Sequence, residues 1–338
     1  MTVTIIENFE QDIKDFIFFD LNPDENLKTK LINKDLNELI IIHSNWSQRT
    51  VSPRPRQVHY SSEIYSNQYY NDKKTVIEIL KQKFLAGNSI RPYLSRGIKN
   101  IFIENDTSSS SDKDLMLNEW GIHHLHLGEN LEPDGFIERT PAVLFCKIMN
   151  NDVYFIDILD HGNGHLPWTE KKLLEIIQAN WPELMKPYEM KDVIDLSYHA
   201  SNEDHHKLRR SGISTNLKIG DKFYSPPTGG ITLNGYSMLS SLNIILFRKL
   251  INANKKDFQK YRYEIQKFIL DVTKIKYNLL KFKLLFSKDG WYYLELNSNT
   301  RIDITDSHKQ MTIILQLQKN VFCIQPDNDF YFQLGLTV

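Results

Sequence analysis

Three histidines close together are the residues of this sequence best suited to chemistry. The segment from Gly121 to Leu127 reads Gly-Ile-His-His-Leu-His-Leu, and in an extended strand alternate side chains share a face. We therefore expect His124 and His126 to point one way and His123 to point the other. Because an unperturbed imidazole titrates near neutral pH, such a pair is suited to general acid–base catalysis.

The same alternation rule gathers further titratable groups around this pair. The segments 142–148 and 153–159 also read as strands, and their less apolar faces contribute a lysine, an aspartate and a following histidine. If these faces coincide in a small antiparallel sheet, the residues on that face are His124, His126, Lys147, Asp157 and His161. Arg139 and His165 lie in loops at strand ends, from which they could reach the same space. This density of titratable groups is typical of an active site.

A divalent metal is the alternative interpretation of the same residues. His124 and His126 have the spacing of two ligands on one strand, and His161, His165 or Asp157 could complete a site for zinc or another divalent cation with an open position for water. The sequence has neither a His-x-x-x-His pair on a predicted helix nor a cysteine cluster. We therefore expect chemistry without a cofactor, and keep a metal-dependent hydrolase or nuclease as the alternative.

The elements that must position these groups form one predicted α-β-β-β-α unit. Apolar spacing over 75–86 predicts an amphipathic helix that ends at Gly87. The two strands after the histidine segment are joined by Met149-Asn150-Asn151-Asp152, a typical hairpin connection. Apolar residues after Thr169 predict a second helix, which ends at Trp181-Pro182.

The rest of the chain predicts a second, C-terminal unit. Two helices and an antiparallel sheet are expected there, and the fold class is therefore α+β. The expected helices cover 237–253 and 256–280, and the expected strands cover 282–287, 291–296, 311–317 and 321–325. Upstream, the sequence predicts a helix at 7–20, a strand at 39–42 and a hairpin around 219–222. We expect an N-terminal domain over 1–190 and a C-terminal domain over 191–338.

Composition limits the function classes. The chain has 338 residues, a formal net charge of −1 and two cysteines far apart in the sequence, so a nucleic acid must be bound by a local basic patch. The cysteines imply no disulfide framework. No apolar run reaches about 18 residues, and no basic region precedes an apolar stretch at the N-terminus. We expect a cytoplasmic protein that has no membrane partner.

The order of elements over about 75–182 resembles the core of RelE/HigB-type mRNA interferase toxins. The likeness consists of a helix followed by Gly-Asn-Ser-Ile-Arg-Pro-Tyr-Leu at 87–94, the strand Trp-Gly-Ile-His-His-Leu-His at 120–126, Arg139, and the strand Val-Tyr-Phe-Ile at 153–156. The resemblance implies a small antiparallel sheet flanked by helices. It also implies an RNA-cleaving activity in which basic and histidine side chains act on the 2′-hydroxyl and the phosphate.

The function that we predict is therefore a metal-independent endoribonuclease of a bacterial toxin–antitoxin or phage-defence system. His124 or His126 would be the base, His161 the acid, and Arg139 or Lys147 the phosphate clamp, with His123 and Asp157 beside them. The residues expected to bind RNA are Arg54, Arg56, Arg91, Arg96 and Tyr93.

A non-catalytic protein-interaction module is the other class that the sequence leaves open. In that case the helices over 237–280 would bind a partner or a second copy, and the histidines would be incidental. The partners considered are thus RNA, a regulatory protein and a homodimer.

Overall fold

A computed structural model of the chain describes residues 3–100, 114–160, 171–232, 236–287 and 290–302. The chain forms two compact units, here called unit 1 (1–43 with 241–338) and unit 2 (44–240). This division differs from the expected one, which separates 1–190 from 191–338. The N-terminal residues belong with the C-terminal half because strand β1 (Thr4–Glu7) pairs with strand β8 (Leu279–Ser287).

Unit 2 is built on a four-stranded sheet that contains the histidine segment. Its strand order is β2 (Gln57–Tyr60), β5 (Asp152–Asp160), β4 (Ala142–Ile148) and β3 (Ile122–His126). Strands β3, β4 and β5 are adjacent and antiparallel, which confirms the prediction from the sequence. Strand β2, which the sequence analysis did not predict, joins parallel to β5.

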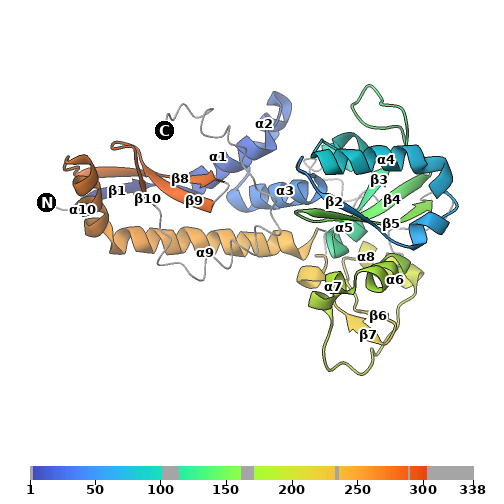
Figure 1. Cartoon of the computed structure of the whole chain (residues 1–338). Coiled ribbons are helices and arrows are strands. Elements are labelled where there is room, and N and C mark those ends of the chain that lie inside the picture. Colours follow the sequence, from blue (N-terminus) through green and yellow to red (C-terminus); the bar gives the residue numbers. More distant parts are fainter. Residues whose placement is uncertain (1–2, 101–113, 161–170, 233–235, 288–289, 303–338) are drawn as a thin grey trace. The chain divides into compact units, whose positions relative to one another are not determined.

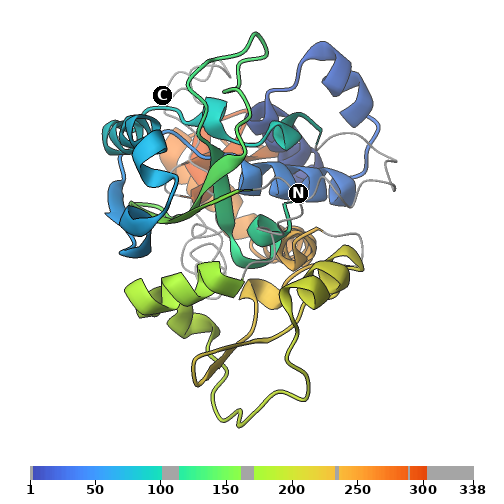
Figure 2. The same ribbon diagram turned by 90° about the vertical axis from the view of Figure 1, so that its right-hand side faces the viewer.

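Helices cover both faces of this sheet (Figures 1 and 2). On one face, helix α4 (Tyr70–Ala86) packs its buried residues, among them Leu80, on sheet residues that include Leu125. On the other, helices α5 (Leu115–Trp120) and α6 (Lys171–Asn180) form an apolar cluster with sheet residues that include Phe145. Because helices cover both faces, polar side chains of the sheet such as His124, His126 and Asp157 are buried.

Shorter elements complete unit 2. They are α7 (Pro182–Met185), α8 (Asn202–Arg210) and the hairpin of β6 (Leu217–Ile219) with β7 (Lys222–Tyr224). This hairpin confirms the one predicted around 219–222. Helix α8 begins with a capping box in which Ser201 and Asp204 satisfy each other's backbone amides.

Unit 1 combines a second sheet with helices. Its strand order is β1, β8, β9 (Gly290–Glu295) and β10 (Thr300–Ile302), and the β8–β9 hairpin confirms the one predicted from the sequence. Its helices are α1 (Phe9–Leu21), α2 (Glu25–Leu31), all but the first three residues of α9 (Met238–Lys260), and α10 (Arg262–Thr273). Helices α9 and α10 meet at Tyr261, so the break lies several residues later than the one expected between 253 and 256. The strands expected at 311–317 and 321–325 lie outside the described residues.

The strand expected at 39–42 is wrong, since these residues belong to helix α3 (Leu36–Arg49). The buried residues Leu36, Leu39 and Ile40 have the i, i+3, i+4 spacing of one helix face. Asp35 also begins the helix, because its side chain accepts the Glu38 amide at 2.8 Å while the Glu38 carboxylate accepts the Asp35 amide at 2.9 Å. This cap and the helical spacing outweigh the β-branched run.

The fold class is α+β, as predicted: the two four-stranded sheets are small and flanked by helices. Within the described ranges, no helix is both long enough and apolar enough to cross a membrane.

Candidate functional site

Strand β3 places His124 and His126 on the face that α5 and α6 cover. The alternation follows the prediction, because Leu125 belongs to the apolar cluster under α4 while Ile122 belongs to the cluster on the opposite face. The rings of His124 and His126 lie with their centroids 5.5 Å apart and their planes at 80°. Only 7% of His124 and 3% of His126 is exposed, so this face is interior rather than wet.

An ionised carboxylate holds one nitrogen of His124. The Nδ1 atom of His124 lies 2.7 Å from Oδ2 of Asp114, the residue just before α5. Burial alone would raise the pKa of Asp114, but the neighbouring His124 and Arg49 outweigh it and hold that pKa below its usual value. The same carboxylate accepts the Leu117 amide at 3.0 Å and thereby caps α5. One side chain thus both begins the helix and orients the imidazole.

Arg49 supplies a buried positive charge to this group. It lies near the end of α3, is buried, and contacts the Asn45 side chain. Burial lowers the pKa of Arg49, and the charge of Asp114 opposes that effect. Arg49, Asp114 and His124 therefore form a buried polar trio that joins α3, the start of α5 and the edge strand.

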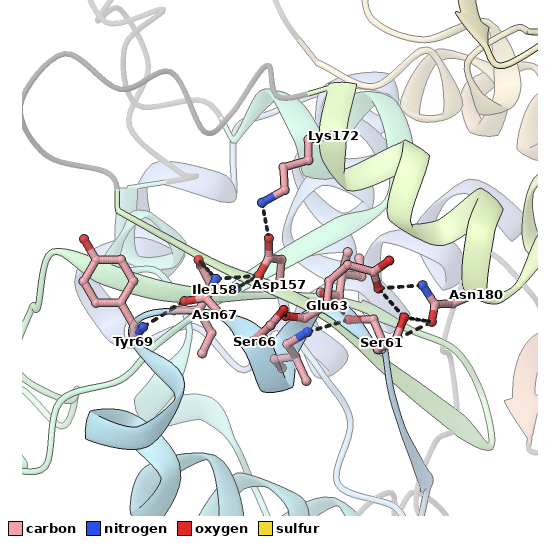
Figure 3. A network of polar contacts seen from close by, with 12 residues as sticks. Ser61, Glu63, Ser66, Asn67, Tyr69, Asp157, Ile158, Lys172 and Asn180 are labelled. Carbon is pink, nitrogen blue, oxygen red and sulfur yellow. Dashed lines mark hydrogen bonds and ion pairs between the residues drawn. The ribbon is translucent and has the colours of Figure 1, made fainter.

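Asp157 shares the face of His124 but serves another contact. Phe145 on the middle strand β4 is the register partner of both His124 on β3 and Asp157 on β5. His124 and Asp157 are therefore two strand spacings of about 4.8 Å apart, with the Phe145 ring between them. The Asp157 carboxylate binds Lys172 Nζ at 2.7 Å and Asn67 Nδ2 at 2.6 Å (Figure 3). The irregular register at Phe145/Cys146 brings this carboxylate to α6. Asp157 therefore ties α6 and the loop at Asn67 to the sheet.

The other expected catalytic residues are dispersed. Lys147 Nζ donates to the Trp120 carbonyl at 3.0 Å, and burial lowers its pKa to about 8. His123 faces the opposite side, and burial lowers its pKa to about 4. Arg139 is exposed in the segment before β4. His161 and His165, the expected acid and the expected further metal ligands, lie outside the described residues.

Most of the residues expected to bind RNA are engaged within unit 2. Arg56 is buried and donates to the Met149 carbonyl at 2.8 Å, and Tyr93 is 7% exposed. Arg96 pairs with Glu132 and Asp134. Arg91 is exposed but lies over the Phe136 ring at 5.3 Å, and Arg54 is half-buried. These arginines and Tyr93 do not form one open basic surface.

A second buried ion pair, not anticipated from the sequence, fixes the other end of α5. Glu119 pairs with Arg209 of α8, and their side chains are 1% and 3% exposed. Beside it, His205 Nδ1 lies 2.8 Å from the Thr215 hydroxyl, and burial lowers the pKa of His205 to about 4. In the sequence, the Ser-x-x-Asp cap marks the start of α8. Glu119, the partner of Arg209, lies about 90 residues away, and no local pattern indicates that pairing.

Sequence reasoning also missed Asp114 and Arg49. Asp114 is recognisable as a helix cap only once α5 is known, and Arg49 follows a segment whose apolar run indicates a strand. Within the described ranges, no group of three or more His, Cys, Asp and Glu side chains is arranged to hold a metal ion.

Comparison with known proteins assigns no relative to this chain. No protein-family model, no curated protein and no solved structure matches it.

Proposed function

We propose that unit 2 cleaves RNA by metal-independent acid–base chemistry centred on His124. The observation that carries the proposal is the 2.7 Å contact between His124 Nδ1 and the Asp114 carboxylate, whose pKa is held low by His124 and Arg49. A carboxylate in this position fixes the imidazole tautomer and stabilises the imidazolium that forms when the ring accepts a proton. The resemblance to mRNA interferases supplies RNA as the substrate.

The reaction needs one base and one acid. His124 Nε2 would take the proton of a 2′-hydroxyl, whose oxygen attacks the adjacent phosphorus. The 5′-oxygen then leaves with a proton from an acid, and a 2′,3′-cyclic phosphate remains. His126 is a candidate for that acid because its ring centroid lies 5.5 Å from that of His124. Arg139, which is exposed before β4, is the candidate cation for the phosphate.

The depth of the two rings favours a second candidate, the non-catalytic module. With His124 and His126 only 7% and 3% exposed, the trio with Asp114 and Arg49 could serve only to join α3 and α5 to the sheet. Buried charges of this kind destabilise a protein when one partner is removed. The two candidates predict different effects of His124→Ala. The ribonuclease should lose activity, whereas the non-catalytic module should lose stability.

Incubating the purified chain with end-labelled RNA, with and without a chelator, tests the proposal. We expect cleavage that survives chelation and leaves cyclic phosphate ends. His124→Ala should reduce cleavage by about 10²–10⁴-fold, the usual contribution of a general base. His199→Ala, which removes an exposed histidine in the same unit, is the matched control and should cleave normally.

Circular dichroism and thermal unfolding of both variants separate catalysis from folding. Cleavage by His124→Ala at the normal rate would contradict the proposal. Loss of cleavage on chelation would instead support the metal-dependent alternative. A wild-type chain that leaves RNA intact, combined with an unfolded His124→Ala variant, would support the non-catalytic module.

A further inference from the structure

The residues around the junction of α9 and α10 in unit 1 are strongly basic. Residues 249–276 contain seven lysines and one arginine but only three acidic residues, in a chain whose formal net charge is −1. The chain therefore concentrates positive charge here while remaining neutral overall. A local field of this kind attracts polyanions even when the net charge does not.

Three of the four lysines of α9 form one exposed stripe. Lys249, Lys256 and Lys260 are exposed and have the i, i+7, i+11 spacing that keeps side chains on one side of a helix. Ile251 and Phe258, with exposed fractions of 2% and 1%, lie on the opposite side and pack into the unit. Because that side of the helix is buried, the lysines on the other side point toward solvent.

Exposed aromatic rings continue this stripe at the junction. Tyr261 and Tyr263 are 37% and 51% exposed. Each lies beside a cation: Lys260 Nζ is 4.7 Å from the Tyr261 ring centroid, and Arg262 Cζ is 4.9 Å from that of Tyr263. Two cation–aromatic pairs in consecutive residues therefore adjoin the end of the lysine stripe.

We infer that this surface binds single-stranded nucleic acid. We call it the basic–aromatic surface and define it by Lys249, Lys256, Lys260, Tyr261, Arg262 and Tyr263. Cations that follow a phosphate backbone, interleaved with rings on which bases stack, are the combination that single strands require. Duplex bases are already stacked and would leave the two tyrosines unused. The inference rests on the proposed function in that RNA is the strand that unit 2 would cleave.

Other polyanionic partners fit this surface less well. An anionic membrane is bound by helices that segregate basic residues from a continuous apolar face. The apolar side of α9 packs into unit 1 and is not available for this, whereas α10 exposes Phe268 and Val272 beside the basic–aromatic surface. Vesicle binding is therefore the competing outcome that the test measures. An acidic protein would be recognised by the charges alone. Both remain outcomes of the test below.

Fluorescence anisotropy with a labelled single-stranded oligodeoxythymidylate tests the inference independently of cleavage. This probe has no 2′-hydroxyl, so the proposed reaction cannot cut it. The full-length chain should bind it, and binding should weaken with salt. Lys256→Glu combined with Lys260→Glu should weaken binding at least about tenfold and reduce the salt slope by roughly 0.7 for each phosphate that the variant no longer neutralises. Tyr261→Ala combined with Tyr263→Ala should weaken binding about 30-fold or more with the slope unchanged, since each base–aromatic stack contributes roughly fivefold or more.

The matched control is Lys28→Glu combined with Lys30→Glu, which makes the same charge change on exposed residues of α2 in the same unit. It should bind like the wild type, and so should His199→Ala, which changes an exposed residue of unit 2. Unchanged binding by both surface variants would overturn the inference. So would equally weakened binding by the control, no binding by the wild type, equal affinity for a duplex, or tighter binding to phosphatidylglycerol vesicles or polyglutamate.

The two proposals fail separately. If the surface variants no longer bind the oligonucleotide while wild-type protein leaves RNA intact, the binding surface stands and the cleavage proposal fails. If His124→Ala alone abolishes cleavage while the surface variants bind normally, the reverse holds.

Discussion

Removing the positive charge of Arg209 should strongly destabilise unit 2. Arg209 and Glu119 are paired with side-chain exposures of only 3% and 1%, so solvent does not screen either charge. The change Arg209→Met keeps much of the side-chain volume and leaves Glu119 buried without its partner. Breaking a buried pair in this way costs about 3–5 kcal/mol. For a unit of this size, that corresponds to a fall in Tm of roughly 6–20 °C.

The pH dependence gives the result a second signature. Burial already raises the pKa of Glu119 despite the neighbouring Arg209, and without that arginine the pKa should rise further. A carboxyl group whose folded pKa exceeds its unfolded pKa destabilises the fold above the folded value, and the penalty is relieved as pH falls toward the unfolded value. The difference between Arg209→Met and wild type should therefore shrink in mild acid.

Urea unfolding followed by tryptophan fluorescence measures these free energies, since Trp120 is buried next to Glu119 in unit 2. The double variant Glu119→Leu with Arg209→Met is the control. Replacing both charges with apolar groups is often neutral or stabilising, and we expect most of the stability to be recovered. A single variant within about 1 kcal/mol of wild type at neutral pH, or a double variant as unstable as the single one, would refute the reasoning.

Three further outcomes are expected. Asp157→Asn should lower the free energy of unfolding by about 1–3 kcal/mol, whereas Lys172→Met should cost less because that lysine is half exposed; urea unfolding that ranks them in the opposite order would contradict this. Gly87→Ala should cost about 1–3 kcal/mol, since Gly87 has φ of 72° and an added Cβ would lie 2.7 Å from Pro55; an unchanged Tm would argue against it. His205 has a folded pKa of about 4, so its contribution should be intact above pH ~6.5 and fall by up to about 3 kcal/mol as pH drops toward 4. His205→Gln should flatten that part of the stability–pH curve, and an equally steep curve would show that other groups cause the fall.

The sequence by itself determined the elements whose signals are local. The alternation in β3, β4 and β5 and their hairpin connection specified three antiparallel strands, and Gly87 specified where α4 ends. The β8–β9 hairpin was predicted for the same reason. The sequence also predicted that His124 and His126 share a face, because side chains alternate along a strand with a period of two residues whatever covers the sheet.

Tertiary structure decided what that face does. The sequence could not reveal that α5 and α6 cover this face, and the structure places it in the interior. Nor could it place Asp114 beside His124 or Glu119 beside Arg209, since these contacts join residues 10 and 90 positions apart. Burial then changed the chemistry, because charges removed from water must be paired within the fold. The buried Asp157 carboxylate accordingly binds Lys172. The parallel pairing of β1 with β8 is also non-local, and it decided which residues form unit 1.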